Sequence, residues 1–189
     1  MQDIPKWKRK LPNQLTYARM ALVPPIIVLL HFNSLMAGYI SAGIFIVASI
    51  TDYWDGELAR RWGVVSNLGK FLDPVADKIL VSSTLVMLIP SGRLDAAMVV
   101  ILLARDSLIS ALRSVAAAEK MIIPAGTLGK WKTATQMLAI PAILINVPIF
   151  GLPLFKLGYW ILWVSVALSV ISGAMYVWDY YRHPGGSKT

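Results

Sequence analysis

The chain has 189 residues, of which 57% are hydrophobic and 15% charged. Soluble domains are usually about 45–50% apolar and about 25% charged, so this composition indicates a protein with lipid as part of its solvent. The chain has no cysteine and two histidines. This excludes disulfides, zinc–thiolate sites and thiol nucleophiles, and argues against a multi-histidine metal site or a serine–histidine triad.

The net charge of +8 raises the question of an anionic partner. Nucleic-acid binding would need a solvated basic domain. None is left once the apolar segments are removed, so we expect no nucleic-acid partner. Anionic membrane lipids and the orientation of the chain in the membrane account for part of the basic charge. Binding of a phosphorylated substrate is the functional interpretation of the remaining basic charge.

The predicted elements begin with a basic stretch from Ile4 to Leu11, which has the pattern of a short amphipathic helix lying on a membrane. Six apolar segments follow, each close to the ~20 residues that cross a bilayer as a helix. They span residues 14–33, 36–59, 70–90, 94–117, 131–150 and 156–179. No small-residue cleavage site follows the first apolar run, so we expect it to be retained as a span.

The predicted fold class is all-α integral membrane, with six transmembrane helices preceded by a short interfacial amphipathic helix. No internal repeat or linker divides the chain, so residues 1–189 are expected to form one domain. Its parts are an interfacial arm at 1–13, a six-helix membrane domain at 14–182 and a tail at 183–189.

The distribution of lysine and arginine predicts the orientation of this domain. Basic residues concentrate in the N-terminal arm, in the turns near 60–70 and 119–132, and in the tail. The three opposite turns contain only Arg93 and Lys156. Because cytoplasmic turns carry the excess of positive charge, we expect both termini in the cytoplasm.

The stretch from Thr51 to Lys78 concentrates small and acidic residues where the second apolar segment leads into the third. Its residues at helical spacing are Asp52, Asp55, Gly56, Ala59 and Arg60, followed by Gly69, Asp73 and Asp77. An antiparallel helix pair would bring the four carboxylates into one pocket at the cytoplasmic side. Like charges this close, near a membrane, need compensating cations. An all-oxygen set suits Mg²⁺ or Mn²⁺, ions that commonly hold phosphates.

The small residues of this stretch have two interpretations. Gly56, Ala59 and Gly69 either pack helices closely, as small residues do in membranes, or leave room for a bulky substrate. Four neighbouring aspartates favour the second interpretation. Arg60 is expected to clamp a phosphate, with a simple membrane anchor as the alternative.

The pattern Asp52-x2-Asp55-Gly56-x2-Ala59-Arg60-x8-Gly69-x3-Asp73-x3-Asp77 resembles the CDP-alcohol phosphatidyltransferase signature at every fixed position and gap. The resemblance implies a six-helix membrane fold, a cytoplasmic nucleotide–metal site and a homodimer. It implies that Asp52, Asp55, Asp73 and Asp77 bind metal, with two Mg²⁺ or Mn²⁺ ions expected per site. It implies that Asp77 is also the general base. Contacts to the cytidine diphosphate part are implied for Gly56, Ala59, Arg60, Ser66 and Gly69.

Motifs outside the signature resemble the members of this family whose acceptor is sn-glycerol 3-phosphate. They are Asn13-x2-Thr16-x2-Arg19, then Ala104-Arg105-Asp106 with Arg113, and Gly129-Lys130-x-Lys132-Thr133-x2-Gln136. The resemblance covers residues 12–140. From it we expect Asn13 and Thr16 beside CDP-diacylglycerol. The cations expected to bind the acceptor phosphate are Arg19, Arg105, Arg113, Lys130 and Lys132.

Arg105 is the most informative of these cations, because it is predicted near the middle of the fourth span, where an unpaired charge is costly. An Arg105–Asp106 ion pair is the alternative to substrate binding. We do not favour that pair, since adjacent residues of a helix do not face each other.

The resemblance therefore implies transfer of a phosphatidyl group from CDP-diacylglycerol to sn-glycerol 3-phosphate, in a bacterial-type inner (plasma) membrane with the active site on the cytoplasmic side. One alternative keeps the chemistry and changes the acceptor to phosphatidylglycerol, inositol phosphate or serine. A cation transporter is a second alternative, although it would need polar groups along a route across the membrane. A third is a non-catalytic membrane scaffold.

Overall fold

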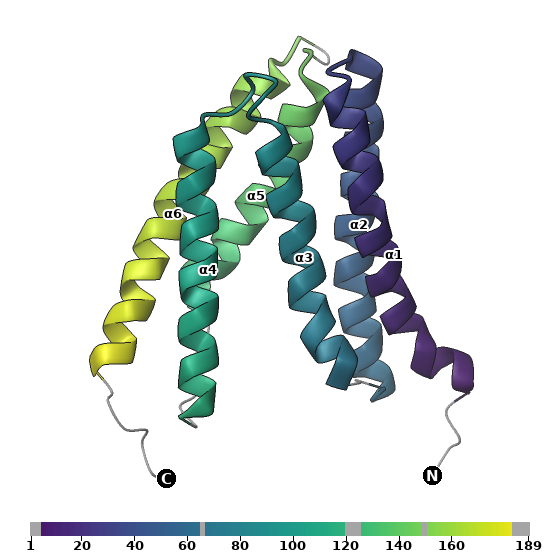
Figure 1. Ribbon diagram of the computed structural model, residues 1–189, viewed down its shortest axis with the longest axis vertical. Helices are drawn as coiled ribbons and strands as arrows, with labels where there is room; N and C mark the ends of the chain where they lie inside the picture. Colours follow the sequence, from purple (N-terminus) through teal and green to yellow (C-terminus); the bar gives the residue numbers. More distant parts are fainter. Residues whose placement is uncertain (1–4, 65–66, 120–125, 149–150, 183–189) are drawn as a thin grey trace.

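The computed structural model describes residues 5–64, 67–119, 126–148 and 151–182, which form six helices (Figure 1). These are α1 Lys6–His31, α2 Leu35–Trp62, α3 Asn67–Met87, α4 Ala96–Ala118, α5 Thr127–Ile145 and α6 Leu154–Arg182. The all-helical prediction is confirmed, and each predicted apolar segment corresponds to one helix, in order.

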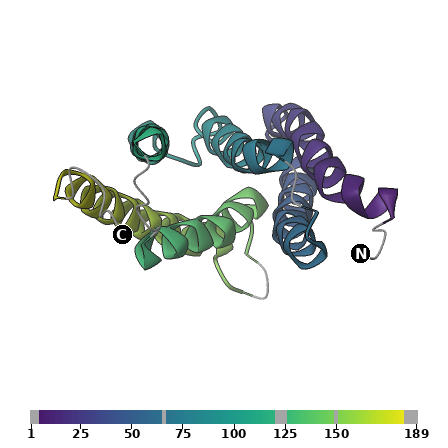
Figure 2. The same cartoon turned by 90° about the horizontal axis from the view of Figure 1, so that it is seen from below.

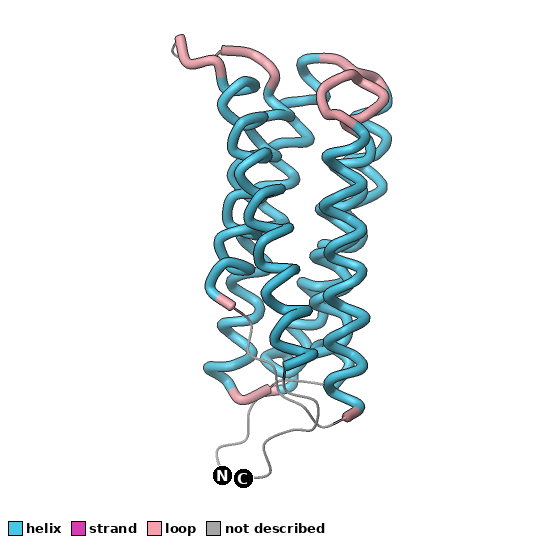
Figure 3. The backbone as a smooth tube through the Cα atoms, turned by 90° about the vertical axis from the view of Figure 1, so that its left-hand side faces the viewer, coloured by secondary structure: helices cyan, strands magenta, loops and turns pink. Residues whose placement is uncertain are grey.

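The helices alternate in direction, so that α1 begins and α6 ends at the same end of the bundle (Figures 1 and 3). We call this end the base and the opposite end the top. The turns that follow α1 and α3 lie at the top. The predicted acidic stretch, which ends α2 and begins α3, lies toward the base.

Three helices of the described chain are long and apolar enough to cross a membrane. The segments that meet this condition are Asn13–His31 of α1, Leu35–Asp52 of α2 and Leu154–Arg182 of α6. The other three helices carry charged residues within them, such as Asp77 in α3, Arg105 in α4 and Lys132 in α5. These charges lower the mean hydropathy of α3, α4 and α5.

The N-terminal arm differs from the expected separate helix, because α1 runs without a break from Lys6 to His31. Figure 1 shows the first turns of α1 bending away from the rest of the helix. Pro12 lies in this part of the sequence, and a proline inside a helix removes one backbone hydrogen bond and bends it. The arm is therefore the first part of α1.

The six helices form two groups of three, with α1, α2 and α3 on one side and α4, α5 and α6 on the other (Figure 2). Packing of α2 against α5 joins the groups, whereas α3 and α4 make few contacts. The apolar core runs through both groups and includes Phe45, Leu85, Met98, Ile140 and Leu162, all fully buried. The weak α3–α4 packing leaves space between the groups.

Arg93 joins the turns at the top of the bundle. It is buried, and its Nη1 donates a hydrogen bond to the backbone oxygen of Leu144 at 3.0 Å, while its Nη2 donates to Asn33 Oδ1 at 3.2 Å. A cation at the C-terminal end of α5 also interacts favourably with the helix dipole. One of the two cations predicted in the top turns is thus part of the packing of the protein.

Candidate active site

The acidic part of the site is formed by α1, α2 and α3. Asp52 of α2 makes an ion pair with Arg19 of α1, whose side chain is fully buried. Asp77 of α3 lies within electrostatic range of both residues. Thr16, one turn before Arg19, is also buried. The three helices therefore gather two of the four predicted metal-binding carboxylates around one buried arginine.

The structure leaves part of this predicted site undescribed. Outside the described residues lie Ser66 and the side chains of Asp55, Gly56, Ala59, Arg60 and Asp73. Asn13 is half-buried, and Gly69 is buried near the start of α3. Among the described side chains no three acidic, histidine or cysteine residues cluster to hold a metal ion. The four-aspartate metal site stays a prediction.

A cavity of about 130 Å³ lies between α3, α4 and α5, and we call it the Asp77 cavity. Its polar wall includes Asp77, Asp106, Lys132 and Gln136, one or two from each of the three helices. This arrangement places a carboxylate that can accept a proton in the same cavity as a cation that can bind a phosphate.

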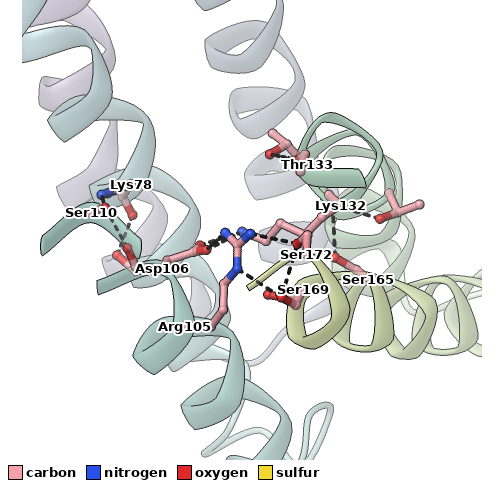
Figure 4. Close-up of polar contacts among 12 residues, drawn as sticks. Lys78, Arg105, Asp106, Ser110, Lys132, Thr133, Ser165, Ser169 and Ser172 are labelled. Carbon is pink, nitrogen blue, oxygen red and sulfur yellow. Dashed lines mark hydrogen bonds and ion pairs between the residues drawn. The ribbon is translucent and has the colours of Figure 1, made fainter. Parts of the chain in front are cut away.

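Asp106 connects the two cations of this region (Figure 4). Lys132 Nζ donates hydrogen bonds to Asp106 Oδ2 at 2.6 Å and to Oδ1 at 2.8 Å. Arg105 Nη1 donates to Asp106 Oδ1 at 3.1 Å. The prediction that Arg105 and Asp106 do not pair is wrong, because the long arginine side chain reaches its neighbour's carboxylate although the two Cβ atoms point apart.

Arg105 is also fixed against α6. Its Nε donates to the backbone oxygen of Ser169 at 3.0 Å, and its Nη2 donates to Ser172 Oγ at 2.7 Å. A Cβ on Gly173 would lie 3.2 Å from Arg105 Cγ, so glycine at this position leaves room for the arginine stem. The guanidinium is therefore held in place by α4 and α6 together.

A second cavity, of about 100 Å³, is lined by Arg105 and other residues of α4, by α6 and by the start of α5. Arg113 lines it and lies over the Tyr176 ring, with Cζ 5.5 Å from the ring centroid, a cation–π distance. The start of α5 lines this cavity, and the N-terminal end of a helix favours negative charge. We call this the Arg113 cavity.

Four of the five predicted acceptor cations are therefore distributed over three places. Lys132 lines the Asp77 cavity, Arg105 and Arg113 line the Arg113 cavity, and Arg19 lies with Asp52. Lys130 is exposed near the start of α5. Asp106 joins the first two places through its bonds to Arg105 and Lys132.

The structure adds two residues to this region that the sequence did not predict as site residues, Asp106 and Gln136. Both were seen only as parts of motifs. An acidic residue inside an apolar segment is a signal for Asp106. The helical spacing of four residues between Lys132 and Gln136, which places them on one face of α5, is a signal for Gln136.

Comparisons with known proteins identify the family of the chain. The family model described as CDP-alcohol phosphatidyltransferase matches residues 9–171. A protein from Rickettsia bellii (strain RML369-C), named CDP-diacylglycerol–glycerol-3-phosphate 3-phosphatidyltransferase, is 39% identical over 172 residues that cover 90% of this chain and 95% of that protein. A protein of the same name from Bacillus subtilis (strain 168) is 39% identical, with 90% and 93% covered. Arabidopsis thaliana has a relative named CDP-diacylglycerol–glycerol-3-phosphate 3-phosphatidyltransferase 2, which is 34% identical, with 91% and 80% covered. The chain belongs to the CDP-alcohol phosphatidyltransferase family.

Proposed function

We propose that the protein transfers the phosphatidyl group of CDP-diacylglycerol to sn-glycerol 3-phosphate, giving phosphatidylglycerophosphate and CMP in phospholipid biosynthesis. The observation that carries this proposal is the Asp77 cavity, in which a carboxylate and the cation Lys132 face the same space. This is the pair of groups needed to deprotonate a hydroxyl and to bind the phosphate of the same small acceptor. The names of the relatives from Rickettsia bellii and Bacillus subtilis agree with this reaction.

In the proposed arrangement all six helices cross a bacterial-type plasma membrane, with the base and both termini in the cytoplasm. The alternation of helix direction and the excess of basic residues in the turns assigned to the base support this orientation. A homodimer is expected from the family resemblance. CDP-diacylglycerol reaches the site from the lipid, and glycerol 3-phosphate reaches it from the cytoplasm.

The cytidine diphosphate part is proposed to bind where α1, α2 and α3 meet. The residues assigned to it are Asn13, Thr16, Gly56, Ala59, Arg60, Ser66 and Gly69. Two Mg²⁺ or Mn²⁺ ions would be held by Asp52, Asp55, Asp73 and Asp77, an all-oxygen set that suits these ions. The buried Arg19 beside Asp52 supports this assignment, since it indicates that the carboxylates need positive charge. When bound, such ions neutralise charge on the pyrophosphate and on the departing CMP.

An apolar groove of about 480 Å³ between α2 and α5 offers a place for the acyl chains. It is lined by Ile46, Ile50 and Trp54 of α2 and by Leu138 and Pro141 of α5, among others. Ile50 and Trp54 flank Asp52 in the sequence. A lipid whose headgroup lies at Asp52 could therefore lay an acyl chain along this groove, where apolar contact is favourable.

The acceptor is proposed to bind with its phosphate among Arg105, Arg113, Lys130 and Lys132, and Arg19 adds to the positive charge nearby. Asp77 then accepts the proton of the primary hydroxyl. The resulting oxygen forms a bond to the phosphorus that carries the diacylglycerol, and the bond from that phosphorus to CMP breaks. Fixing both substrates in this geometry supplies much of the rate enhancement.

The test is to give purified protein CDP-diacylglycerol with each of four acceptors: glycerol 3-phosphate, phosphatidylglycerol, inositol phosphate and serine. CMP release with glycerol 3-phosphate alone, lost on chelation and restored by Mg²⁺ or Mn²⁺, is the expected result. CMP release with another acceptor instead would support the same reaction with a different acceptor substrate. No release with any acceptor would refute the proposal. Lys156→Ala replaces an exposed residue at the top of the bundle. This control variant should release CMP as the wild type does.

A further inference from the structure

Gln136 is a buried polar side chain that faces the Asp77 cavity. Its side chain is 2% exposed, and its Nε2 has no hydrogen-bond partner in the part of the chain that the structure describes. Buried amide groups are nearly always hydrogen-bonded, because an unpaired one keeps the cost of losing water. Gln136 lines a cavity, and its Nε2 has no partner there among the described residues. Its side chain is therefore suited to form a hydrogen bond with a ligand in that cavity.

The position of Gln136 in the cavity is defined by its spacing from Lys132. Four residues of helix separate the two by about 6 Å along the axis of α5, with both side chains on one face. Since α5 runs from the base to the top, Gln136 lies deeper in the bundle than Lys132. Leu85 and Leu102 also line this cavity, so the carboxamide is a polar group with apolar neighbours.

The size of the cavity restricts the ligand. Its volume of about 130 Å³ is several times the ~10–15 Å³ that a cavity needs in order to hold one water molecule. A three-carbon polyol fits such a space. The cavity therefore has room for the reacting end of an acceptor and for little more.

The chemistry of the cavity wall indicates which group of the acceptor meets Gln136. A carboxamide can both donate and accept hydrogen bonds, and so can a hydroxyl, whereas a phosphate dianion only accepts. The phosphate is better matched by the cation Lys132, which lines the cavity and shares Asp106 with Arg105. The hydroxyl that reacts belongs beside Asp77. This leaves a second, non-reacting hydroxyl as the partner for Gln136.

We propose that Gln136 is a specificity-determining residue that hydrogen-bonds the secondary hydroxyl of glycerol 3-phosphate, the hydroxyl between the reacting carbon and the phosphate-bearing carbon. This inference rests on the proposed function and adds to it the reason for choosing a polyol phosphate. A site built to bond a substrate hydroxyl discriminates against an analogue that lacks it. The protein therefore prefers glycerol 3-phosphate to 3-hydroxypropyl phosphate, which has the same chain without that hydroxyl.

The experiment measures kcat/KM for CMP release with both acceptors, in the full-length protein and in the variant Gln136→Met. Methionine has a similar length and no strong hydrogen-bonding group, so the buried position stays filled. The wild type is expected to favour glycerol 3-phosphate by about tenfold or more. The variant is expected to lose about tenfold with glycerol 3-phosphate and to be unchanged with 3-hydroxypropyl phosphate, so that the preference disappears.

The control variant is Thr135→Val, one position earlier on α5. The Thr135 hydroxyl donates to backbone oxygens of Trp131 and Lys132 within its own helix, so the preference between acceptors should persist in this variant. Thermal unfolding of each purified variant verifies that it is folded.

Three results would overturn the inference. The first is an equal loss with both acceptors in Gln136→Met, which would show a structural role. The second is a folded Gln136→Met variant with unchanged activity on glycerol 3-phosphate. The third is a wild type that uses both acceptors equally well. A wild type that releases no CMP with either acceptor would instead refute the proposed function, and this inference with it.

Discussion

Asp77 shares its cavity with the Lys132–Asp106 pair and lies within electrostatic range of Asp52, so its carboxylate has both acidic and basic neighbours. Asparagine has nearly the same shape but cannot accept the proton of the acceptor. We expect Asp77→Asn to lower kcat by about 10²–10⁴-fold, the usual contribution of a general base. CMP release at saturating concentrations of both substrates measures this effect.

The matched control for this prediction is Asp95→Asn. Asp95 is an exposed carboxylate at the start of α4, at the top, where its Oδ2 accepts a hydrogen bond from Tyr159 at 2.5 Å. The Asp95→Asn variant therefore lacks a carboxylate but should keep the kcat of the wild type. A folded Asp77→Asn protein that binds CDP-diacylglycerol and turns over at the wild-type rate would contradict the role of Asp77 as base.

Asp106 gives a second prediction for a single residue. It accepts hydrogen bonds from Lys132 and Arg105, and Lys132 is buried. Asp106→Asn removes the negative charge shared by the two cations, which should lower the free energy of unfolding by about 1–3 kcal/mol. We also expect the KM for glycerol 3-phosphate to rise roughly tenfold, because Lys132 is no longer held toward the cavity.

Kinetics with varied acceptor and thermal unfolding in detergent together measure the effect of Asp106→Asn. The control is Glu119→Gln, which removes another carboxylate at the end of α4. Glu119 is exposed, and its Oε2 accepts a hydrogen bond from Tyr180 at 3.2 Å. A fall in the KM for the acceptor would show that Asp106 competes with the phosphate for Lys132, contrary to this prediction.

The sequence predicted that Asp52 and Asp77 lie on an antiparallel pair of helices, because a short turn joins the two segments. In the structure α2 and α3 make few direct contacts, and α1 packs against both. The sequence did not predict the Arg105–Asp106 contact. The rule that adjacent helical residues point apart describes Cβ directions, and a long arginine side chain is free to turn back. Nor could it show that Gln136 has no partner, since that depends on which side chains three separate helices bring together.

Among whole elements, the helices were better predicted than their ends. The fifth segment was expected from residue 131, but α5 begins at Thr127. Lys130 and Lys132 were counted as marking a turn, whereas Lys132 is buried inside the bundle against Asp106. A hydropathy scale scores every lysine as solvent-exposed. The predicted helix is therefore too short wherever a lysine near its end has a buried partner.

The packing of α2 against α5 gives a prediction for an element. A Cβ on Gly38 of α2 would overlap the backbone oxygen of Leu144 in α5, whereas a Cβ on Gly43 of the same helix would meet nothing within 4 Å. Gly38→Ala should lower the free energy of unfolding by about 1–3 kcal/mol, because the two helices must move apart. Gly43→Ala is the control and should be neutral or stabilising, since alanine favours a helix.

Thermal unfolding of the two variants in the same detergent measures this difference. If both proteins unfold at the same temperature, the close approach of α2 and α5 is not a requirement of the fold. Because packing of α2 and α5 joins the two three-helix groups, we expect Gly38→Ala also to reduce CMP release, and Gly43→Ala to leave it unchanged.

For the molecule as a whole, the two three-helix groups divide the proposed reaction between them. The group of α1, α2 and α3 carries the acidic residues assigned to CDP-diacylglycerol and its metal ions. The group of α4, α5 and α6 carries most of the cations assigned to the acceptor phosphate. Since α3 and α4 make few contacts, the Asp77 cavity lies where the groups face each other. Both substrates can therefore meet at Asp77 while each is bound by a different group.

The proposed number of membrane spans depends on the whole chain and can be tested on α4. α4 carries three charged residues, yet in the proposed arrangement it crosses the membrane as the apolar α6 does. The chain has no cysteine, so single cysteines can be introduced at exposed positions on the same helix: Ala97 and Ala118 in α4, Lys156 and Tyr181 in α6. In spheroplasts, a membrane-impermeant maleimide should label the cysteines at 97 and 156, at the top. Those at 118 and 181, at the base, should react only after detergent is added. The α6 pair is the reference for a crossing helix. Equal labelling of both α4 positions before detergent would show that α4 does not cross, and labelling of the base alone would place the active site outside the cell.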